Sequence, residues 1–267
     1  MLYFNSNGSL LKEDELLYDF HSASTNFTTR VYEIVPLSEL SEQTLEPYYF
    51  NVMAFMRVYR MPIPISYTLE FFVEQIQQVF DQNRVSLDDY FIKWEVVLIG
   101  QESHFFLSLK QKEQIKYIEG SANGFDLFKD AYWNSSFVSG IPSVTPSVFS
   151  LATGFCNDHQ LSDVAIINER KELVHTLNGF LFLRFGEVLK TPSEQTGVYR
   201  LQARSSFLDA IAKQGTYVLE QSVMTPFELQ RADECFIYRP EGVLVGVQGY
   251  RKKRYALEAV QSLRVLV

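Results

Sequence analysis

The chain has 267 residues, of which 46% are hydrophobic and 21% charged. This composition is that of a folded globular protein and excludes a chain that is disordered throughout. Its 32 acidic residues outnumber 24 lysines and arginines, and the net charge of −8 argues against a nucleic-acid partner. Two cysteines exclude a disulfide scaffold and a four-cysteine zinc site, so we expect Cys156 and Cys235 to be buried thiols.

No targeting or membrane segment is visible in the sequence. The N-terminus lacks the basic start and apolar core of a signal peptide, and no apolar stretch is long enough to span a bilayer. We therefore expect a cytoplasmic protein without a membrane partner. The only dense basic run, Arg251–Arg254, is expected to be a solvated charge cluster.

The first part of the chain predicts strands, two helices and further strands. Asn7-Gly8 predicts a hairpin turn between a strand over 1–5 and a second strand at Leu10 and Leu11. A strand is predicted over 30–35, and apolar residues at helical spacing predict helices over 45–59 and 68–82. Thr68 is the expected N-cap of the second helix. Strands are predicted over 89–99, 102–109 and 116–119, with a turn at Gly100 between the first two.

Residues 119–146 are rich in glycine, serine and proline, which interrupt any periodicity. We expect this segment to link a smaller α/β lobe over 1–118 to a larger lobe over 147–267. In the larger lobe, Thr191-Pro192 predicts a turn and Thr225 a helix cap. Helices are predicted over 147–159, 205–214 and 226–232, strands over 163–167, 180–185, 217–221, 235–238 and 243–247, and a closing element over 260–267.

Familiar catalytic motifs are absent from the sequence. It contains no phosphate loop of the G-x-x-x-x-G-K-S/T type, no G-x-G-x-x-G and no G-x-S-x-G. The four histidines show no metal-ligand spacing, so no metal site is predicted. A catalytic triad built on serine or cysteine remains an alternative, because its members can be far apart in the sequence. Pattern alone thus indicates a soluble α+β protein.

Six groups of residues carry a resemblance to a known family by their order along the chain. They are 7–10, 31–33, 49–57, 163–168, 181–183 with 191–192, and 228–229 with 232–236. In this order they resemble the class IV aminotransferases. This family of fold-type IV enzymes uses pyridoxal phosphate (PLP) and includes branched-chain aminotransferases, D-amino-acid aminotransferases and 4-amino-4-deoxychorismate lyases. The resemblance implies a two-lobed α+β fold, with a small α/β lobe and a larger barrel-like α+β lobe, and a homodimer.

The residues that the family uses for catalysis are replaced. The position of the lysine that forms the Schiff base with PLP falls on Ile141, which has no amine. The position of the glutamate that holds the pyridine nitrogen falls on His175. A neutral imidazole does not favour a pyridinium as a carboxylate does. The plain alternative for His175 is a histidine on a half-exposed strand.

The phosphate-binding residues of the family are also altered. Its histidine and arginine on the first helix fall on Tyr48 and Asn51, which removes a bidentate phosphate contact. A glycine-containing turn at a helix start, which gives backbone N–H groups to phosphate, matches Leu201–Arg204 and keeps only its arginine. A further turn, whose hydroxyl binds phosphate in the family, matches Arg239–Gly242, where proline lacks an N–H and Glu241 repels an anion.

We therefore expect a class IV aminotransferase-like pseudoenzyme that has lost PLP and catalysis and is kept for binding or assembly. No cofactor is expected. The partners are a second copy or a paralogue in a dimer, and a small anion in the old cleft. One alternative is an active PLP-dependent aminotransferase or 4-amino-4-deoxychorismate lyase with a displaced lysine, for which Lys129 is the candidate. Another is cofactor-free chemistry, or a different fold. The cleft residues are Tyr32, Tyr48, Asn51, His175, Leu201, Gln202 and Arg204, with Arg30 as a further candidate.

Overall fold

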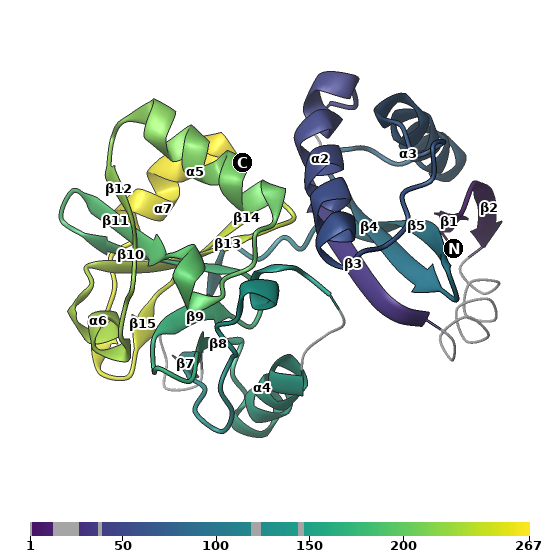
Figure 1. Ribbon diagram of the computed structural model, residues 1–267. Helices are drawn as coiled ribbons and strands as arrows, with labels where there is room; N and C mark the ends of the chain where they lie inside the picture. Colours follow the sequence, from purple (N-terminus) through teal and green to yellow (C-terminus); the bar gives the residue numbers. More distant parts are fainter. Residues whose placement is uncertain (1, 13–26, 37–38, 119–123, 144–146) are drawn as a thin grey trace. The chain divides into compact units, whose positions relative to one another are not determined.

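The computed structural model describes residues 2–12, 27–36, 39–118, 124–143 and 147–267 (Figure 1). By its internal contacts the chain forms two compact units. Unit 1 contains the described residues up to Lys112, together with Pro142, Ser143 and Leu201–Ala203, and unit 2 contains the others. The two ends of the expected 119–146 linker lie outside the described residues, as do Met1 and Glu119 at the ends of two expected strands.

Unit 1 is an antiparallel sheet with two helices on one face. The strands lie in the order β2-β1-β5-β4-β3 (Figure 1). Asn7 and Gly8 both have positive φ (49° and 94°), which confirms the hairpin turn between β1 and β2. The elements are β1 Tyr3–Ser6, β2 Ser9–Lys12, β3 Phe27–Val35, α2 Glu42–Val58, α3 Leu69–Asn83, β4 Tyr90–Ile99 and β5 Glu102–Gln111.

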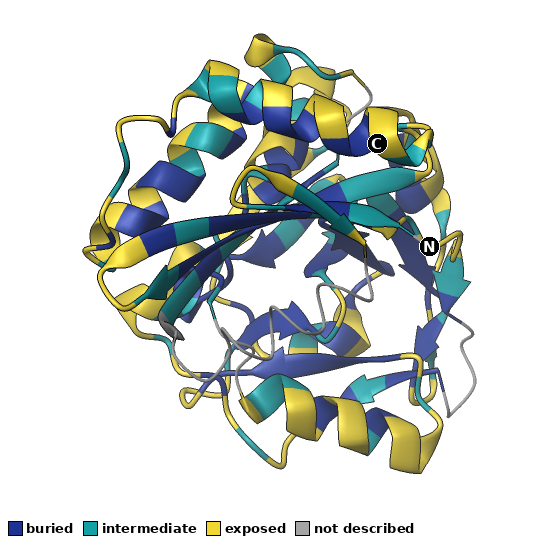
Figure 2. Cartoon of the chain, turned by 90° about the vertical axis from the view of Figure 1, so that its right-hand side faces the viewer, coloured by how far each residue is buried: buried dark blue, intermediate teal, exposed yellow. Residues whose placement is uncertain are grey.

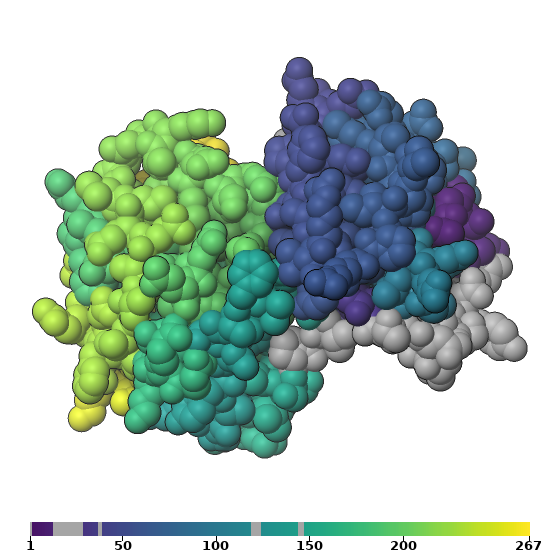
Figure 3. Space-filling model, viewed as in Figure 1, coloured from purple at the N-terminus to yellow at the C-terminus, as the bar shows by residue number. Residues whose placement is uncertain are grey.

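Alternation along the strands decides which side chains of this sheet meet the helices. Trp94 of β4 lies 4.3 Å from Phe72 of α3, measured between ring centroids. In β3 the inward row is Val31, Glu33 and Val35, and all three are fully buried. Two valines are ordinary at such positions, whereas a carboxyl group is not. Figure 3 shows the side chains of the two helices, in blue, covering this side of unit 1.

Local side-chain hydrogen bonds begin both helices of unit 1. Thr68 caps α3 as expected, accepting from the N–H of Phe71 at 3.2 Å. Helix α2 begins three residues before the predicted Leu45, because Ser41 and Thr44 form a capping box. Pro47 is the sixth residue of α2, beyond the first turn, so the helix lacks the hydrogen bond that an N–H there would donate to the carbonyl oxygen of residue 43.

Unit 2 is built on a six-stranded and a three-stranded sheet. The strand orders are β12-β11-β10-β13-β14-β6 and β7-β8-β9, and β15 pairs with β16 in a short hairpin. The strands are β6 Tyr117–Ile118, β7 Phe125–Leu127, β8 Asp163–Ile167, β9 Leu173–Thr176, β10 Phe180–Phe185, β11 Val188–Pro192, β12 Val218–Ser222, β13 Glu234–Arg239, β14 Val243–Val247, β15 Gly249–Tyr250 and β16 Lys253–Arg254. The helices are η1 Phe137–Gly140, α4 Ser147–His159, η2 Glu194–Thr196, α5 Gln202–Gln214, α6 Pro226–Arg231, α7 Glu258–Leu263 and η3 Arg264–Leu266.

The inner strands β10, β13 and β14 of the larger sheet are buried on both faces, whereas the edge strand β12 is largely exposed. On one face Phe207 of α5 stacks with Tyr238 and meets Phe182 edge to face, with ring centroids 4.2 and 5.5 Å apart, and Phe236 stacks on Phe182 at 5.1 Å. On the other face the alternate residues of β10, β13 and β14 join one apolar cluster with residues of β7, β8 and β9. Figure 2 shows strands largely in dark blue and helices with yellow, exposed residues on their outer side. Strands buried on both faces explain why β10 and β13 read as continuous apolar runs.

Two expectations about this unit are wrong. Thr191-Pro192 is not a turn but the end of β11, paired with Gln221 and Ser222 of β12. Extended backbone accommodates the fixed φ of proline at the last position of a strand, and the Thr191 hydroxyl donates to the carbonyl oxygen of Leu181. Strand β9 is buried at all four positions, so His175 does not lie on a half-exposed strand.

The expectation of buried thiols is confirmed, since Cys156 and Cys235 are both free and buried. Within the described part of the chain, no helix has the length and apolar character needed to cross a membrane.

Candidate functional site

His175 lies in an aromatic surround in unit 2. Its imidazole centroid is 5.0 Å from the ring of Trp133 and 4.8 Å from that of Tyr199. Phe149 and Phe180 approach it at 6.0 and 6.2 Å. The side chain is 2% exposed, and its Nε2 has no hydrogen-bond partner among the described residues.

This surround makes the charged imidazolium unfavourable. Burial and, to a smaller extent, the nearby positive charge of Arg204 together lower the pKa of His175 to about 3. The imidazole is therefore neutral at physiological pH. A neutral ring next to a cation is a poor counterpart for a pyridinium nitrogen, which requires a negative charge beside it.

Arg204 is the second polar side chain of this region. It lies on the first turn of α5, is 2% exposed, and its guanidinium carbon lies 5.7 Å from the centroid of the Phe180 ring. Its Nη2 donates to the carbonyl oxygen of Pro192 at 2.7 Å, while its Nε has no partner in the described part of the chain. Burial lowers its pKa to about 10. Its Nη1 donates to Gln221 Oε1 at 3.5 Å, and the charge of Glu194 favours the guanidinium without an ion pair within 4 Å among the described residues. The Nε is therefore the atom of this side chain that lacks a partner there.

Ile141 lies directly after η1 and is 1% exposed. The preceding Gly140 accepts the N–H of Arg200 through its carbonyl oxygen at 2.8 Å, so this segment runs beside Tyr199, which contacts His175. The side chain at 141 is thus a buried hydrocarbon. It offers no nucleophile, acid or base.

In unit 1 the start of α5 meets strand β3 through Glu33. The N–H of Gln202 donates to Glu33 Oε1 at 3.0 Å, and Asn51 Nδ2 of α2 donates to the same oxygen. Leu201, which precedes the helix, is 2% exposed. Of the predicted cleft residues, the structure therefore brings Asn51 and Gln202 together, and it does so on a carboxyl group that the prediction did not include.

The other predicted cleft residues of unit 1 lie elsewhere in that unit. Tyr32 follows the opposite face of the sheet from Glu33, with the amine of Lys93 at 5.2 Å from its ring centroid. Arg30 shares the face of Tyr32 and pairs with Glu95 at 3.2 Å. Tyr48 is buried on α2 at 7% exposure.

The turn at residues 239–242 is held by a hydrogen bond within it. The N–H of Gly242 donates to the carbonyl oxygen of Arg239 at 2.9 Å, and the guanidinium of Arg239 pairs with Glu113 at 2.5 Å. Pro240 is buried and has no N–H to offer. This turn therefore presents neither a hydroxyl group nor a free arginine to an anion.

The lysine candidate lies in a different environment. Lys129 is exposed and lines a small surface hollow of about 160 Å³ together with Pro226, Phe227 and Tyr250. None of these residues belongs to the aromatic surround of His175. Every lysine in the described part of unit 2 is exposed or only partly buried, which is the usual situation of a solvated charge.

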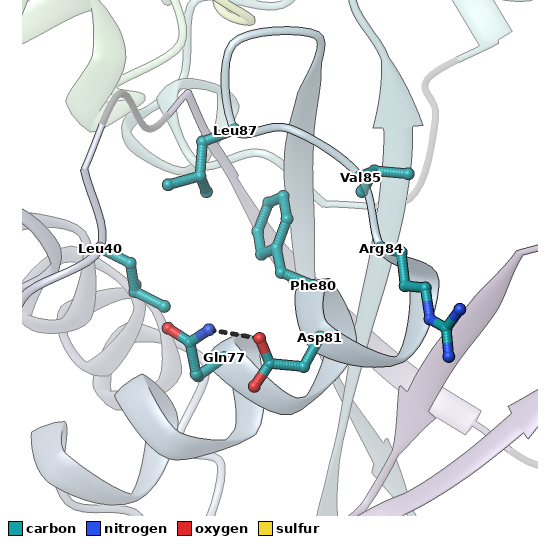
Figure 4. Close-up of a pocket in the computed structure, with 7 residues that line it drawn as sticks. All are labelled: Leu40, Gln77, Phe80, Asp81, Arg84, Val85 and Leu87. Atoms are coloured by element: carbon teal, nitrogen blue, oxygen red, sulfur yellow. Dashed lines mark hydrogen bonds between the residues drawn. The ribbon is translucent and has the colours of Figure 1, made fainter.

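A larger groove of about 470 Å³ lies at the C-terminal end of α3 (Figure 4). Leu40, Phe80 and Leu87 supply its apolar wall, and Gln77 donates to Asp81 across one turn of the helix at 2.8 Å. None of the predicted site residues lines this groove.

Glu33 is the residue of interest that sequence reasoning missed. The signal was present, because the inward-facing row of β3 reads Val, Glu, Val, and an acidic residue between buried valines must find partners or remain protonated. No local sequence pattern identified its partners, which are Asn51 and the N–H of Gln202.

Comparison with solved structures shows the fold. A branched-chain aminotransferase from Thermobaculum terrenum in its PLP form superposes with a TM-score of 0.77 at 14% identity, covering 99% of this chain and 92% of that one. A branched-chain aminotransferase from Thermoproteus uzoniensis with norvaline gives 0.77 at 12% identity, with 99% and 92% covered. A Legionella pneumophila protein described as a 4-amino-4-deoxychorismate lyase gives 0.75 at 14% identity, with 89% of each chain covered.

No family model matches the sequence, and no curated protein sequence matches it. At these identities the structural likeness shows the fold alone. It confirms the expected two-lobed α+β architecture of the fold-type IV PLP enzymes.

The residues at the predicted positions lack the groups that PLP would need. A Schiff base requires an amine, and position 141 is a buried isoleucine. The Nε2 of His175 is buried without a partner on a ring kept neutral, which cannot balance a pyridinium. The N–H at the start of α5, a natural phosphate donor, is already engaged by Glu33.

Proposed function

We propose that this chain, which has the fold of the class IV aminotransferases, is a non-catalytic member of that structural group and does not use PLP. The observation that carries the proposal is the side chain at residue 141. PLP chemistry requires an amine that forms a covalent bond with the cofactor and later moves a proton. Ile141, 1% exposed, can do neither.

The charge balance around His175 supports the same conclusion. At the position where the resemblance predicts a carboxylate against the pyridine nitrogen of PLP, this region holds the neutral imidazole of His175. The guanidinium of Arg204 is the nearby charge. A cofactor ring that must become positive would meet a second positive charge without compensation. Such an arrangement raises the free energy of the charged ring instead of lowering it.

A binding or assembly role is what remains for such a chain. We propose a small anionic ligand, because the buried Arg204 guanidinium forms no ion pair among the described residues and its Nε has no hydrogen-bond partner there. We further propose a cytoplasmic dimer, formed with a second copy or with a paralogue. Light scattering at several protein concentrations tests the dimer, and a monomer at all of them would contradict it.

The decisive experiment is incubation of the purified protein with excess PLP, a visible spectrum, reduction with borohydride, and peptide mapping by mass spectrometry. We expect no aldimine absorbance and no stoichiometric adduct at any lysine. The matched control is Lys129→Ala, which should behave as the wild type.

A single stoichiometric adduct in the wild type would overturn the proposal. If that adduct disappeared in Lys129→Ala, the active-enzyme alternative with a displaced lysine would take its place. Scattered, substoichiometric labelling of exposed lysines, unchanged in Lys129→Ala, agrees with the proposal, because free amines react with any aldehyde.

A further inference from the structure

A tight hairpin in unit 2 carries the basic run of the sequence. Strands β15 and β16 pair antiparallel, and the turn between them consists of Arg251 and Lys252. Arg251 has a φ of 54°, where glycine, asparagine or aspartate is the usual residue of a turn. Turn chemistry therefore does not explain why an arginine, followed by three further cations, stands at this position.

Most cations of this hairpin have no carboxylate beside them. In the part of the chain that the structure describes, Arg251 pairs with Asp126 at 3.8 Å, and the other three members of the run form no ion pair. Lys252 and Arg254 are exposed, as is Lys129 nearby, which is likewise unpaired among those residues. The chain as a whole has a net charge of −8, so this is a basic area on an acidic protein. Such an area attracts acidic partners.

The small hollow that Lys129 lines adjoins this hairpin. Figure 1 shows α6 next to β15, and both contribute to the hollow. Its volume of about 160 Å³ is close to that of protein cavities that admit a benzene ring, so it has room for one apolar side chain. The residues that line it are Leu127, Lys129, Pro226, Phe227, Gln230, Tyr250 and Arg251.

The apolar wall and the cations of this area lie on the same side. Phe227 is 75% exposed at the rim of the hollow, and water contact with so much apolar surface is unfavourable. Lys253 is the direct cross-strand neighbour of Tyr250, so it extends from the face of the hairpin that Tyr250 presents to the hollow. An apolar recess is thus bordered by positive charges.

We propose that this hollow and hairpin form a docking surface for a peptide segment of an acidic partner protein. One aromatic or aliphatic side chain of the segment enters the hollow beside Phe227, and flanking carboxylates pair with Lys129, Arg251 and Lys253. A recess for a single side chain fits a peptide, whereas the negative net charge opposes a long polyanion such as nucleic acid. The inference is independent of the anion proposed at Arg204, because the two places share no residue.

Fluorescence anisotropy with the full chain tests the surface. The probe is a labelled synthetic peptide in which one phenylalanine is flanked by glutamates, and we expect binding that weakens as salt is added. An otherwise identical peptide with alanine in place of the phenylalanine should bind about tenfold more weakly, as expected when one buried apolar side chain is lost. A peptide with lysines in place of the glutamates should not bind. These comparisons use the wild-type protein, so they are decisive even if a variant fails to fold.

Charge-reversal variants locate the binding. Arg251→Glu combined with Lys253→Glu should abolish it. The matched control is Arg57→Glu combined with Lys213→Glu, which changes the net charge equally at exposed positions of α2 and α5 and should bind as the wild type does. Phe227→Ser should weaken binding of the phenylalanine peptide, with thermal unfolding as the check that each variant is folded.

The proposal is overturned if the alanine peptide binds as tightly as the phenylalanine peptide, because charge alone would then hold it. It is also overturned if the control variant loses binding as strongly as the hairpin variant. Single-stranded DNA and phosphatidylserine vesicles are the competing probes. If either binds more tightly than the peptide, and loses that binding in the hairpin variant, the surface belongs to that class of partner instead.

Discussion

His175 and Glu33 are titratable side chains that the fold removes from water without an opposite charge beside them. Each therefore couples protein stability to pH in its own direction, because the folded and unfolded states hold the proton with different affinity. The two effects fall in different pH ranges. They can be measured separately in single variants.

His175 should make the protein sensitive to acid. The folded state keeps its imidazole neutral down to a pKa of about 3, whereas the unfolded chain takes up a proton near the ordinary value of 6.5. Stability from this group is thus complete above pH 6.5 and is lost as pH falls toward 3, by roughly 1.4 kcal/mol for each unit of pH in that range.

In His175→Leu this acid dependence should disappear, and the variant should be at least as stable as the wild type at pH 5, since Nε2 leaves no partner behind. Urea unfolding at pH 4, 5, 6 and 7 measures the difference. His159→Leu, at an exposed position on α4, is the control and should keep the slope of the wild type. An unchanged acid slope in His175→Leu would contradict the prediction.

Glu33 should make the stability of the protein sensitive to alkaline pH. Its pKa is raised from 4.5 to about 8 in the folded protein, so the folded state holds the proton more tightly than the unfolded state. The associated stability is complete below pH 4.5 and is lost as pH rises through 8. Glu33→Gln should remove this alkaline loss and gain stability relative to the wild type between pH 5 and 9.

Guanidinium unfolding at pH 5, 7 and 9 checks this behaviour, with Glu46→Gln as a control at an exposed position of α2. The control should follow the wild type. A difference between Glu33→Gln and the wild type that does not change with pH would show that the group is ionised in both states.

At the scale of elements, helix α7 is held to its sheet by one carboxylate. Glu234 of β13 accepts from the N–H of Ala259 at 2.9 Å and pairs with Arg184 of β10 at 2.8 Å. It therefore caps the helix and neutralises the guanidinium at the same time. The same Arg184 also pairs with Glu258 at 3.4 Å, but that carboxylate is 80% exposed.

Glu234→Ala should cost about 3 kcal/mol of unfolding free energy, because it leaves the partly buried Arg184 with only an exposed ion-pair partner and leaves a helix start uncapped. Glu258→Ala, which removes the exposed partner of the same arginine, should cost less than about 0.5 kcal/mol. Chemical denaturation of both variants measures the contrast. Equal effects would mean that the buried geometry contributes nothing beyond a surface ion pair.

Capping also explains how far element boundaries could be predicted. Thr68 and Thr225 were recognised as caps, and both helices begin directly after them. Ser41 was overlooked because the apolar periodicity of α2 becomes clear only from Leu45 onward. Hydrophobic spacing locates the body of a helix, whereas side-chain hydrogen bonds set its first residue.

At the scale of the whole molecule, unit 1 is not a continuous piece of chain. The N–H of Tyr32 donates to the carbonyl oxygen of Pro142 at 3.1 Å, and the N–H of Gln202 donates to Glu33. Two short segments from the later sequence are thus joined to neighbouring residues of one strand. Opening of the strand at Glu33 should release both of them.

Hydrogen exchange detects this coupling. The amide hydrogens of Tyr32 and Gln202 should exchange slowly in the wild type, and both should exchange faster in Glu33→Ala, although residue 202 is distant in sequence. Peptides from β13 serve as the internal reference and should not change. Protection that stays intact at Gln202 in the variant would show that the contact with Glu33 does not hold the helix start.

The sequence by itself determined helices α2 to α6 and most of the longer strands, but it did not locate β7, β11, β15 or β16. It also determined that residue 141, where the resemblance predicts a reactive lysine, is an isoleucine. These are properties of periodicity, turn chemistry and residue identity, which are local. Only the tertiary structure decided that His175 is enclosed by aromatic rings, that Thr191-Pro192 ends a strand, and that Glu33 caps α5. Burial and long-range hydrogen bonds depend on which segments meet in space, and the order of residues along the chain does not record those meetings.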